Sequence, residues 1–67
     1  MVAITLKELK TGDYFTRKPI EEPKESQVFI KRDYCRQDKK YSCERFSDMN
    51  SEIFLKGSTV VYTDFFF

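Results

Sequence analysis

Short segments in which apolar and polar residues alternate run along most of the chain, and this alternation is the period of a strand with one buried face. In the first clear segment, Tyr14 and Thr16 lie on the face opposite Phe15. Pro19 ends that strand because proline cannot donate to a sheet ladder. Five or six short strands are predicted in all, over residues 2–4, 13–18, 27–36, 41–46, 52–55 and 59–65.

Between the first two segments, Thr5-Leu6-Lys7-Glu8 has the pattern of a capping box, in which a hydroxyl and a carboxylate satisfy backbone amides at the start of a helix. One or two helical turns are expected over residues 6–10, and Gly12 provides the left-handed position after them. A helix of five residues is not stable alone, so this turn is expected to cap the mouth of a small barrel.

The middle of the chain is predicted to form a hairpin around the four-residue loop 37–40. In that register Tyr34 faces Cys43, and one face gathers an apolar set suited to a core. That set is Val28, Ile30, Tyr34, Tyr41 and Cys43. A three-residue loop would instead place Cys35 opposite Cys43 and scatter the apolar residues. A slip of one residue inverts every side chain, so the apolar pattern favours the four-residue loop.

Three further segments complete the predicted organisation. Residues 19–26 contain two prolines and are expected to form an exposed loop, and residues 47–51 have turn chemistry. The last hairpin is expected around Lys56-Gly57. The whole chain, 1–67, is thus predicted to be one mainly β domain, a small SH3-like barrel of five to six strands with one short capping helical turn. A five-stranded OB-like barrel is the alternative.

The composition agrees with this fold and excludes several functions. Phenylalanine and tyrosine supply 7 and 4 of the 67 residues, which is typical of a pleated, half-buried surface. A chain of this length buries only about 60% of its unfolded surface, so its stability margin is small. There is no histidine, and two cysteines cannot complete a tetrahedral zinc site. No catalytic, metal-binding or cofactor-binding residue is therefore predicted, and the protein is expected not to be an enzyme.

One segment resembles the start of a calcium loop, with oxygen-bearing side chains at alternate positions over residues 48–52. Ile53 occupies the position that such a loop reserves for glycine, and Thr59 stands where the last glutamate would be. The segment is therefore interpreted as an Asx turn.

The charge is balanced overall, with a formal net charge of +1, but the central hairpin is basic. From residue 31 to residue 45 there are six basic and three acidic side chains. Aromatic rings flanked by cations are the surface with which small barrels bind single strands, so nucleic-acid contact is one hypothesis. Its residues are Arg32, Tyr34, Arg36, Lys39, Lys40, Tyr41 and Arg45. A solvated hairpin whose charges prevent strand pairing is the other interpretation.

Localisation is inferred from the cysteines and the apolar runs. The sequence begins without a basic leader and apolar core of the secretory type, and it has no run of 18 apolar residues. A cytoplasmic protein without membrane contact is expected. Cys35 and Cys43 are accordingly expected to be reduced thiols, with a cross-strand disulfide as the alternative.

The C-terminal strand is apolar on both faces, with Val61, Phe65 and Phe67 on one face and Val60, Tyr62 and Phe66 on the other. Such a strand is either sandwiched in the monomer or covered by another molecule. The second alternative predicts a partner interface, which includes a symmetric dimer, at Val61, Phe65, Phe66 and Phe67.

Three stretches together resemble short proteins encoded by phages and mobile elements of gut anaerobes. They are residues 6–15 (LKELKTGDYF), 39–43 (KKYSC) and 48–57 (DMNSEIFLKG). The resemblance implies an accessory protein of a phage or integrated element and transfers no catalytic residue. The sequence as a whole predicts a non-enzymatic interaction module with a protein partner or a second copy, and with no small-molecule substrate. A single-stranded nucleic-acid or RNA binder is the alternative.

Overall fold

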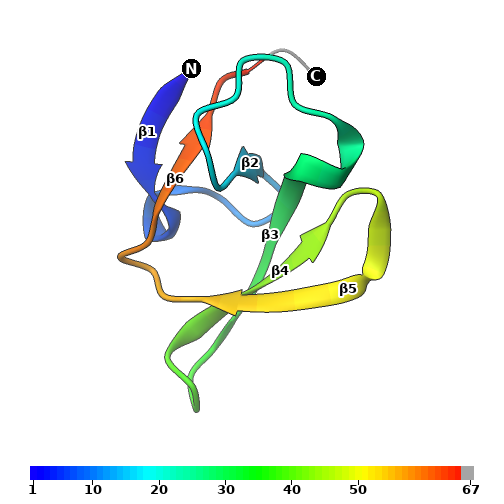
Figure 1. Cartoon of the computed structure of the whole chain (residues 1–67). Coiled ribbons are helices and arrows are strands. Elements are labelled where there is room, and N and C mark those ends of the chain that lie inside the picture. Colours follow the sequence, from blue (N-terminus) through cyan, green and yellow to red (C-terminus); the bar gives the residue numbers. More distant parts are fainter. Residues whose placement is uncertain (66–67) are drawn as a thin grey trace.

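A computed structural model describes residues 1–65 of the chain, and for Met49 its backbone only. In this part of the chain, strands form a single antiparallel sheet in the order β1-β6-β2-β3-β4-β5 (Figure 1). The strands are β1 (Val2–Thr5), β2 (Tyr14–Thr16), β3 (Val28–Cys35), β4 (Lys40–Arg45), β5 (Asp48–Leu55) and β6 (Val60–Thr63). Two short 3-10 helices, η1 (Leu6–Glu8) and η2 (Glu25–Gln27), lie between them.

The predicted mainly β fold with one short capping turn after the first strand is confirmed. The sheet is not closed as a barrel, however, because β1 and β5 are its two edges and do not pair within residues 1–65. Two backbone hydrogen bonds instead join η1 to the segment after β5. The amide of Leu6 donates to the carbonyl of Thr59 at 2.9 Å, and the amide of Lys7 donates to the carbonyl of Gly57 at 3.0 Å.

η1 lacks the predicted capping box, because the side chains of Thr5 and Glu8 bond to each other and not to backbone amides. The hydroxyl of Thr5 donates to the carboxylate of Glu8 at 2.7 Å. The left-handed position predicted at Gly12 is confirmed by its φ of 96°, and its amide donates to the carbonyl of Lys31 at 2.7 Å.

Gly12→Ala is expected to lower the free energy of unfolding by about 1–2 kcal/mol, because a Cβ is unfavourable at positive φ. An added Cβ there would meet nothing within 4 Å, so backbone conformation alone causes the loss. Urea denaturation followed by circular dichroism measures it. Gly12→Asn, whose side chain tolerates this conformation better, is the control and should lose less. Equal losses in both variants would contradict the explanation.

The core lies where η1 packs against one face of the sheet. The ring of Phe15 stacks on that of Phe29, with ring centroids 5.8 Å apart. The buried apolar cluster consists of Leu6, Leu9, Phe15, Phe29, Cys43 and Val61, with Ile4, Tyr41, Ile53 and Leu55 packed against it. Side chains from η1 and from β2, β3, β4 and β6 thus meet in one place, although these elements are far apart in sequence.

The predicted register of the central hairpin is wrong by two positions. The turn has four residues as expected, but it spans residues 36–39, so Tyr34 pairs with Tyr41 rather than with Cys43. A β-bulge then shifts the pairing, because Arg32 and Asp33 together oppose the single residue between Tyr41 and Cys43. Cys43 consequently pairs with Lys31.

The bulge also changes which side of the hairpin faces the core. Phe29 packs in the core cluster, and alternation places Lys31 on the same face. Val28 and Ile30, predicted on the core face, are buried on the opposite face of the sheet. Of the other residues predicted there, Cys43 is buried, Tyr41 packs against the cluster, and Tyr34 is exposed.

The predicted hairpin around Lys56-Gly57 does not form. Strand β5 pairs with β4, whereas β6 pairs with β1 and β2. A strand that is apolar on both faces gains most from a central position, and β6 occupies one, with Val61 fully buried. Val60, on the other face of β6, is 54% exposed, so β6 is central in the sheet but is covered on one face only.

The two predicted irregular segments are mostly as expected. The amide of Asn50 donates to the Oδ1 atom of Asp48 at 3.1 Å, which confirms the Asx turn, although β5 already begins at Asp48. In the connection 19–26 most residues are exposed, but Pro23 is buried and η2 forms at its end. No helix in residues 1–65 has the length and apolar character needed to cross a membrane.

Candidate functional site

The hairpin of β3 and β4 projects from the body of the molecule as a two-stranded arm (Figure 1). Two tyrosines pair across it, with their ring centroids 4.8 Å apart and their planes tilted by 56°. Tyr34 is 47% exposed, whereas Tyr41 is half-buried and packs on the core. The arm therefore presents one aromatic ring to solvent on top of a second ring that is anchored in the fold.

A buried lysine contacts the ring of Tyr41. Lys31 is only 4% exposed, and its Nζ atom lies 4.2 Å from the centroid of the Tyr41 ring. The ammonium group donates to the carbonyl of Leu9 and, at 3.5 Å, to that of Lys7. Burial lowers the pKa of Lys31, and the charges of Asp13 and Cys43 oppose this shift. A cation in this place orients the Tyr41 ring, on which Tyr34 rests.

Lys31 was not among the residues predicted to form a site. In a strand without the bulge, Lys31 would be an ordinary charged residue beside an apolar run. Lys31 and Tyr34 are three positions apart, so in a regular strand their side chains would lie on opposite faces. The bulge between them places Lys31 on the same face as Tyr34 and Tyr41. A basic residue directly after Val28-Phe29-Ile30 was the one feature of the sequence that could have drawn notice.

Three of the predicted cations lie in the turn at the end of the arm or directly beside it. Arg36 and Lys39 are exposed and Lys40 is half-buried. Asp38 reduces the positive charge of this turn, and its carboxylate accepts from the thiol of Cys35 at 3.6 Å. We call Tyr34, Arg36, Lys39, Lys40 and Tyr41 the hairpin tip.

The other two predicted cations lie elsewhere. The Nε atom of Arg32 is 3.3 Å from the carboxylate of Glu44, in a partly exposed ion pair. Arg45 is at the opposite end of the hairpin, where its guanidinium carbon lies 5.5 Å from the centroid of the Phe29 ring. The sequence-predicted set of seven residues is thus divided into the hairpin tip, one ion pair and one distant arginine.

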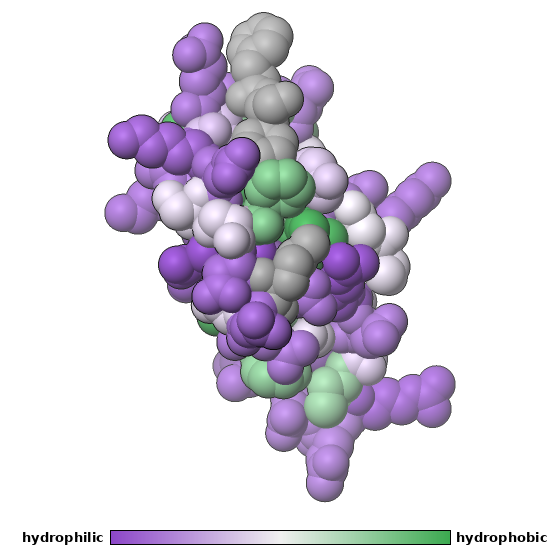
Figure 2. Space-filling view, turned by 90° about the vertical axis from the view of Figure 1, so that its right-hand side faces the viewer, coloured by the Kyte–Doolittle hydropathy of each residue, from purple (hydrophilic) through white to green (hydrophobic). Residues whose placement is uncertain are grey.

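Of the residues predicted to form an interface at the C-terminal strand, Val61 does not lie on the surface. Val61 is fully buried in the core cluster, so its side chain is not available to a partner of the folded monomer. Phe65 is half-buried, and Phe66 and Phe67 lie outside the described residues. The face seen in Figure 2 is mainly hydrophilic, with apolar side chains in small separate spots and long hydrophilic ones projecting at the end of the arm.

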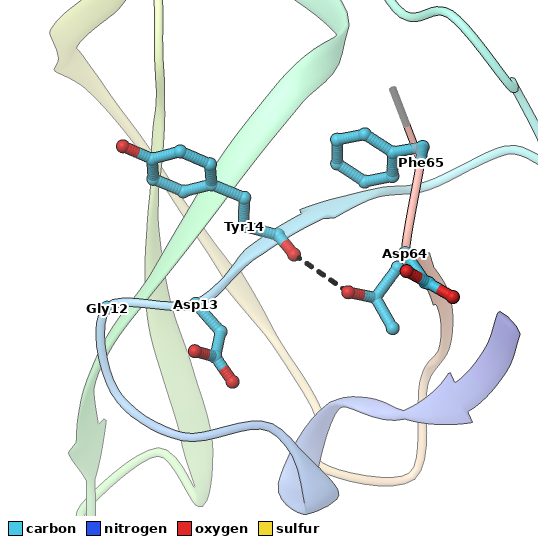
Figure 3. Close-up of a pocket in the computed structure, with 6 residues that line it drawn as sticks. Gly12, Asp13, Tyr14, Asp64 and Phe65 are labelled. Carbon is cyan, nitrogen blue, oxygen red and sulfur yellow. Dashed lines mark hydrogen bonds between the residues drawn. The ribbon is translucent and has the colours of Figure 1, made fainter. Parts of the chain in front are cut away.

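A shallow pocket of about 500 Å³ lies between the start of β2 and the end of β6 (Figure 3). It is lined by Gly12, Asp13, Tyr14, Thr63, Asp64 and Phe65. The hydroxyl of Thr63 donates to the carbonyl of Tyr14 at 3.4 Å, and Asp13 accepts from the amide of Lys10 at 3.0 Å. The described residues hold no group of three potential metal ligands, here or elsewhere.

The two cysteines are free thiols in different surroundings. Cys43 is buried in the core, and burial raises the pKa of its thiol to about 11 against the opposing charges of Lys31 and Arg17. Cys35 is half-buried at the base of the turn. A thiol with a raised pKa is a poor nucleophile at neutral pH, so the geometry offers no cysteine chemistry at Cys43.

A thiol-specific reagent is expected to modify Cys35 within minutes at pH 8 and Cys43 only when the chain unfolds. A disulfide exchange reagent with absorbance detection measures the two rates, and Cys35→Ser is the control that leaves Cys43 as the single thiol.

Because the Cys43 pKa rises from 9.0 to about 11, the contribution of its thiol to stability is present below pH 9 and is lost toward pH 11. Wild type should therefore lose more stability than Cys43→Ala over this interval; equal losses would contradict the raised pKa.

Comparison with protein-family models, with curated proteins and with solved structures gives no match. The function is therefore inferred from the residues of the chain and their geometry. The hairpin tip is the arrangement with the most specific chemistry, because it combines an exposed ring, an anchored ring and three cations.

Proposed function

We propose that the protein is a non-enzymatic interaction module that binds single-stranded nucleic acid or RNA through the hairpin tip. The observation that carries the proposal is the Tyr34 ring, half exposed and supported from below by Tyr41. Every base has a π face, so a ring of this kind binds bases with little regard to sequence, at about 1–3 kcal/mol per stacked base.

Preorganisation of the rings supports this proposal. Tyr41 is held by Lys31 on one side, and an added Cβ at Gly57 would lie only 3.0 Å from its Cε2 atom, so the ring has little room to move. A ligand that stacks on Tyr34 therefore meets a ring pair already in place. Less conformational entropy is lost on binding than with a tyrosine on a mobile loop.

The cations of the turn provide the electrostatic contribution. Arg36, Lys39 and Lys40 can contact up to three phosphates, which releases the counterions of those phosphates. Asp33 and Asp38 lower the local net charge, so moderate affinity in the micromolar range is expected. Binding of this kind is weaker at higher salt, and the dependence on salt reports the number of phosphate contacts.

Affinity for a short oligonucleotide is expected to fall about 15-fold between 50 and 200 mM salt, since three phosphate contacts on a single strand give a logarithmic slope of about −2. Fluorescence anisotropy with labelled oligonucleotides measures it. The double variant Lys39→Gln, Lys40→Gln should reduce the slope to about −0.7.

The double variant Lys10→Gln, Lys24→Gln is the matched control, because it removes the same charge from exposed positions outside the hairpin. An equal change of slope in both double variants would point to binding by overall charge. Absence of binding at 50 mM salt would rule out the proposal and leave a protein partner or a second copy of the chain as the ligand. Light scattering of the intact protein tests that second outcome.

We also infer a cytoplasmic location and an origin in a phage or mobile element. Two unpaired thiols suit a reducing compartment, and the origin is suggested by the sequence resemblance. A gene located among replication or regulatory genes would favour the nucleic-acid proposal, and a gene among capsid genes would favour a protein partner.

A further inference from the structure

A second pocket, of about 490 Å³, is lined by residues of the connection between β2 and β3 and by residues at the ends of β3 and β4 opposite the hairpin tip. It is lined by Arg17, Lys18, Ile20, Ser26, Gln27, Phe29 and Arg45. Three of these side chains are cations, and none of the described lining residues is acidic. We propose that this basic pocket binds a phosphate monoester.

The fold fixes the positions from which the cations enter the pocket. Thr16 is fully buried, and its hydroxyl donates to the carbonyl of Lys18 at 2.7 Å, which holds the bend that carries Arg17 and Lys18. On the other side, the amide of Phe46 donates to the carbonyl of Val28 at 2.8 Å and holds the end of β4 against the start of β3. The three cations therefore converge from two separate parts of the backbone.

Arg45 is the residue that points most directly to a ligand. Its side chain lies over the Phe29 ring, which orients the guanidinium group. Its Nε atom is buried and has no hydrogen-bond partner among the described residues. A buried donor without an acceptor destabilises the fold, and an anion in the pocket would supply the acceptor.

The remaining polar groups of the pocket are suited to the same ligand. The Oε1 atom of Gln27 accepts from the amide of Lys24 at 2.8 Å, which leaves its N–H groups as the donors of that side chain. Ser26 adds a hydroxyl. Three cations with additional donors match a dianionic phosphate, since arginine binds phosphate oxygens in a bidentate manner. Ile20 and Phe29 provide apolar contact for the group esterified to the phosphate.

The ligand has two possible sources, which are a free nucleotide and the 5′-phosphate of a strand. Inorganic phosphate, a nucleoside 5′-monophosphate and the matching nucleoside are titrated into the full chain, and two-dimensional NMR follows the Nε–H resonance of Arg45 and the amides of residues 26–29. Both phosphates should shift these resonances and the nucleoside should not. Absence of any shift with phosphate, or equal shifts at exposed lysines throughout the molecule, would overturn the proposal.

Two variants test the assigned residues. Arg17→Gln removes an exposed cation and Arg45→Lys keeps the charge but removes the Nε donor, and each should weaken monophosphate binding about tenfold. Arg32→Lys, outside both the pocket and the hairpin tip, is the matched control and should leave it unchanged. Unchanged affinity in both pocket variants, with the fold intact by circular dichroism, would overturn the proposal.

A 5′-phosphorylated and a 5′-hydroxyl oligonucleotide of one sequence then distinguish the two sources. Tighter binding of the phosphorylated strand assigns the pocket to a strand end, and equal binding of the two strands assigns it to the free nucleotide already seen by NMR. The inference does not depend on the hairpin tip, because Tyr34→Ala should weaken oligonucleotide binding and leave monophosphate binding intact. Each proposal can therefore fail without the other.

Discussion

Replacing Lys31 by alanine is expected to lower the free energy of unfolding by about 2–4 kcal/mol, the largest effect of any charged residue considered. The substitution removes a side chain that is 4% exposed and leaves a cavity beside Tyr41. It also leaves the carbonyl of Leu9 without the donor that the ammonium group provides. Because a chain of this size has a small stability margin, a loss of this magnitude would partly unfold the protein.

Chemical denaturation with urea, followed by circular dichroism, measures the effect. Lys24→Ala is the control, since Lys24 is exposed beside η2. Lys31→Met separates volume from charge, because methionine fills the same space without the ammonium group. If Lys31→Met equals or exceeds the wild type in stability, the charged contacts make no net contribution and packing alone explains the alanine result.

The pH dependence of the same proteins provides a second measurement. The pKa of Lys31 is 10.5 in the unfolded chain, and burial lowers it in the folded state. Between the lowered folded-state pKa and 10.5, the folded state therefore binds fewer protons than the unfolded state. Lys31 therefore makes stability rise with pH in that interval, and Lys31→Met should lose this rise. The buried Cys43 acts in the opposite direction above pH 9, and only the difference between variant and wild type isolates Lys31.

Tyr34→Ala is expected to weaken binding of a short single-stranded oligonucleotide by a factor of about 5 to 100, which corresponds to the loss of one stacked base. The free energy of unfolding of this variant should differ little from that of the wild type, since the Tyr34 side chain is 47% exposed and lies at the end of the arm. The expected result is thus a loss of affinity without a loss of fold, measured by anisotropy and circular dichroism on the same samples.

Tyr14→Ala is the matched control for this prediction. Tyr14 is a tyrosine of similar exposure, 43%, but it lies on β2 and its ring meets Phe46 at a centroid distance of 5.6 Å. A binding site at the hairpin tip requires Tyr34→Ala to reduce affinity and Tyr14→Ala to leave it nearly unchanged. Similar losses in both variants would show that exposed aromatic rings bind the oligonucleotide wherever they lie, and the hairpin tip would then have no special role. Tyr34→Phe should retain affinity, because the ring provides the stacking surface.

Local chemistry allowed several elements to be predicted correctly. Gly12 was expected at a left-handed position and has a φ of 96°, since a turn after a short helix needs a residue without Cβ. Asp48 was expected to form an Asx turn, and its carboxylate accepts from the amide two residues on. The abundance of aromatic and β-branched residues indicated a mainly β chain, which six strands within residues 1–65 confirm.

Pairing of distant segments could not be predicted in the same way. The sequence contains nothing that distinguishes a hairpin between residues 52–55 and 59–65 from the observed insertion of β6 between β1 and β2, because alternation specifies faces and not neighbours. The bulge at Arg32 and Asp33 is equally invisible in the alternation pattern.

The amino-acid sequence by itself determined the secondary-structure class, the short turns and the absence of histidine and of a complete zinc ligand set. These depend on residue types and on neighbours within a few positions. Only the tertiary structure decided that Lys31 is buried under Tyr41, that Val61 belongs to the core, and that three cations line one pocket. Each of these depends on contacts between segments far apart in the chain, and a single bulge in the β3–β4 pairing is enough to change which side chains meet.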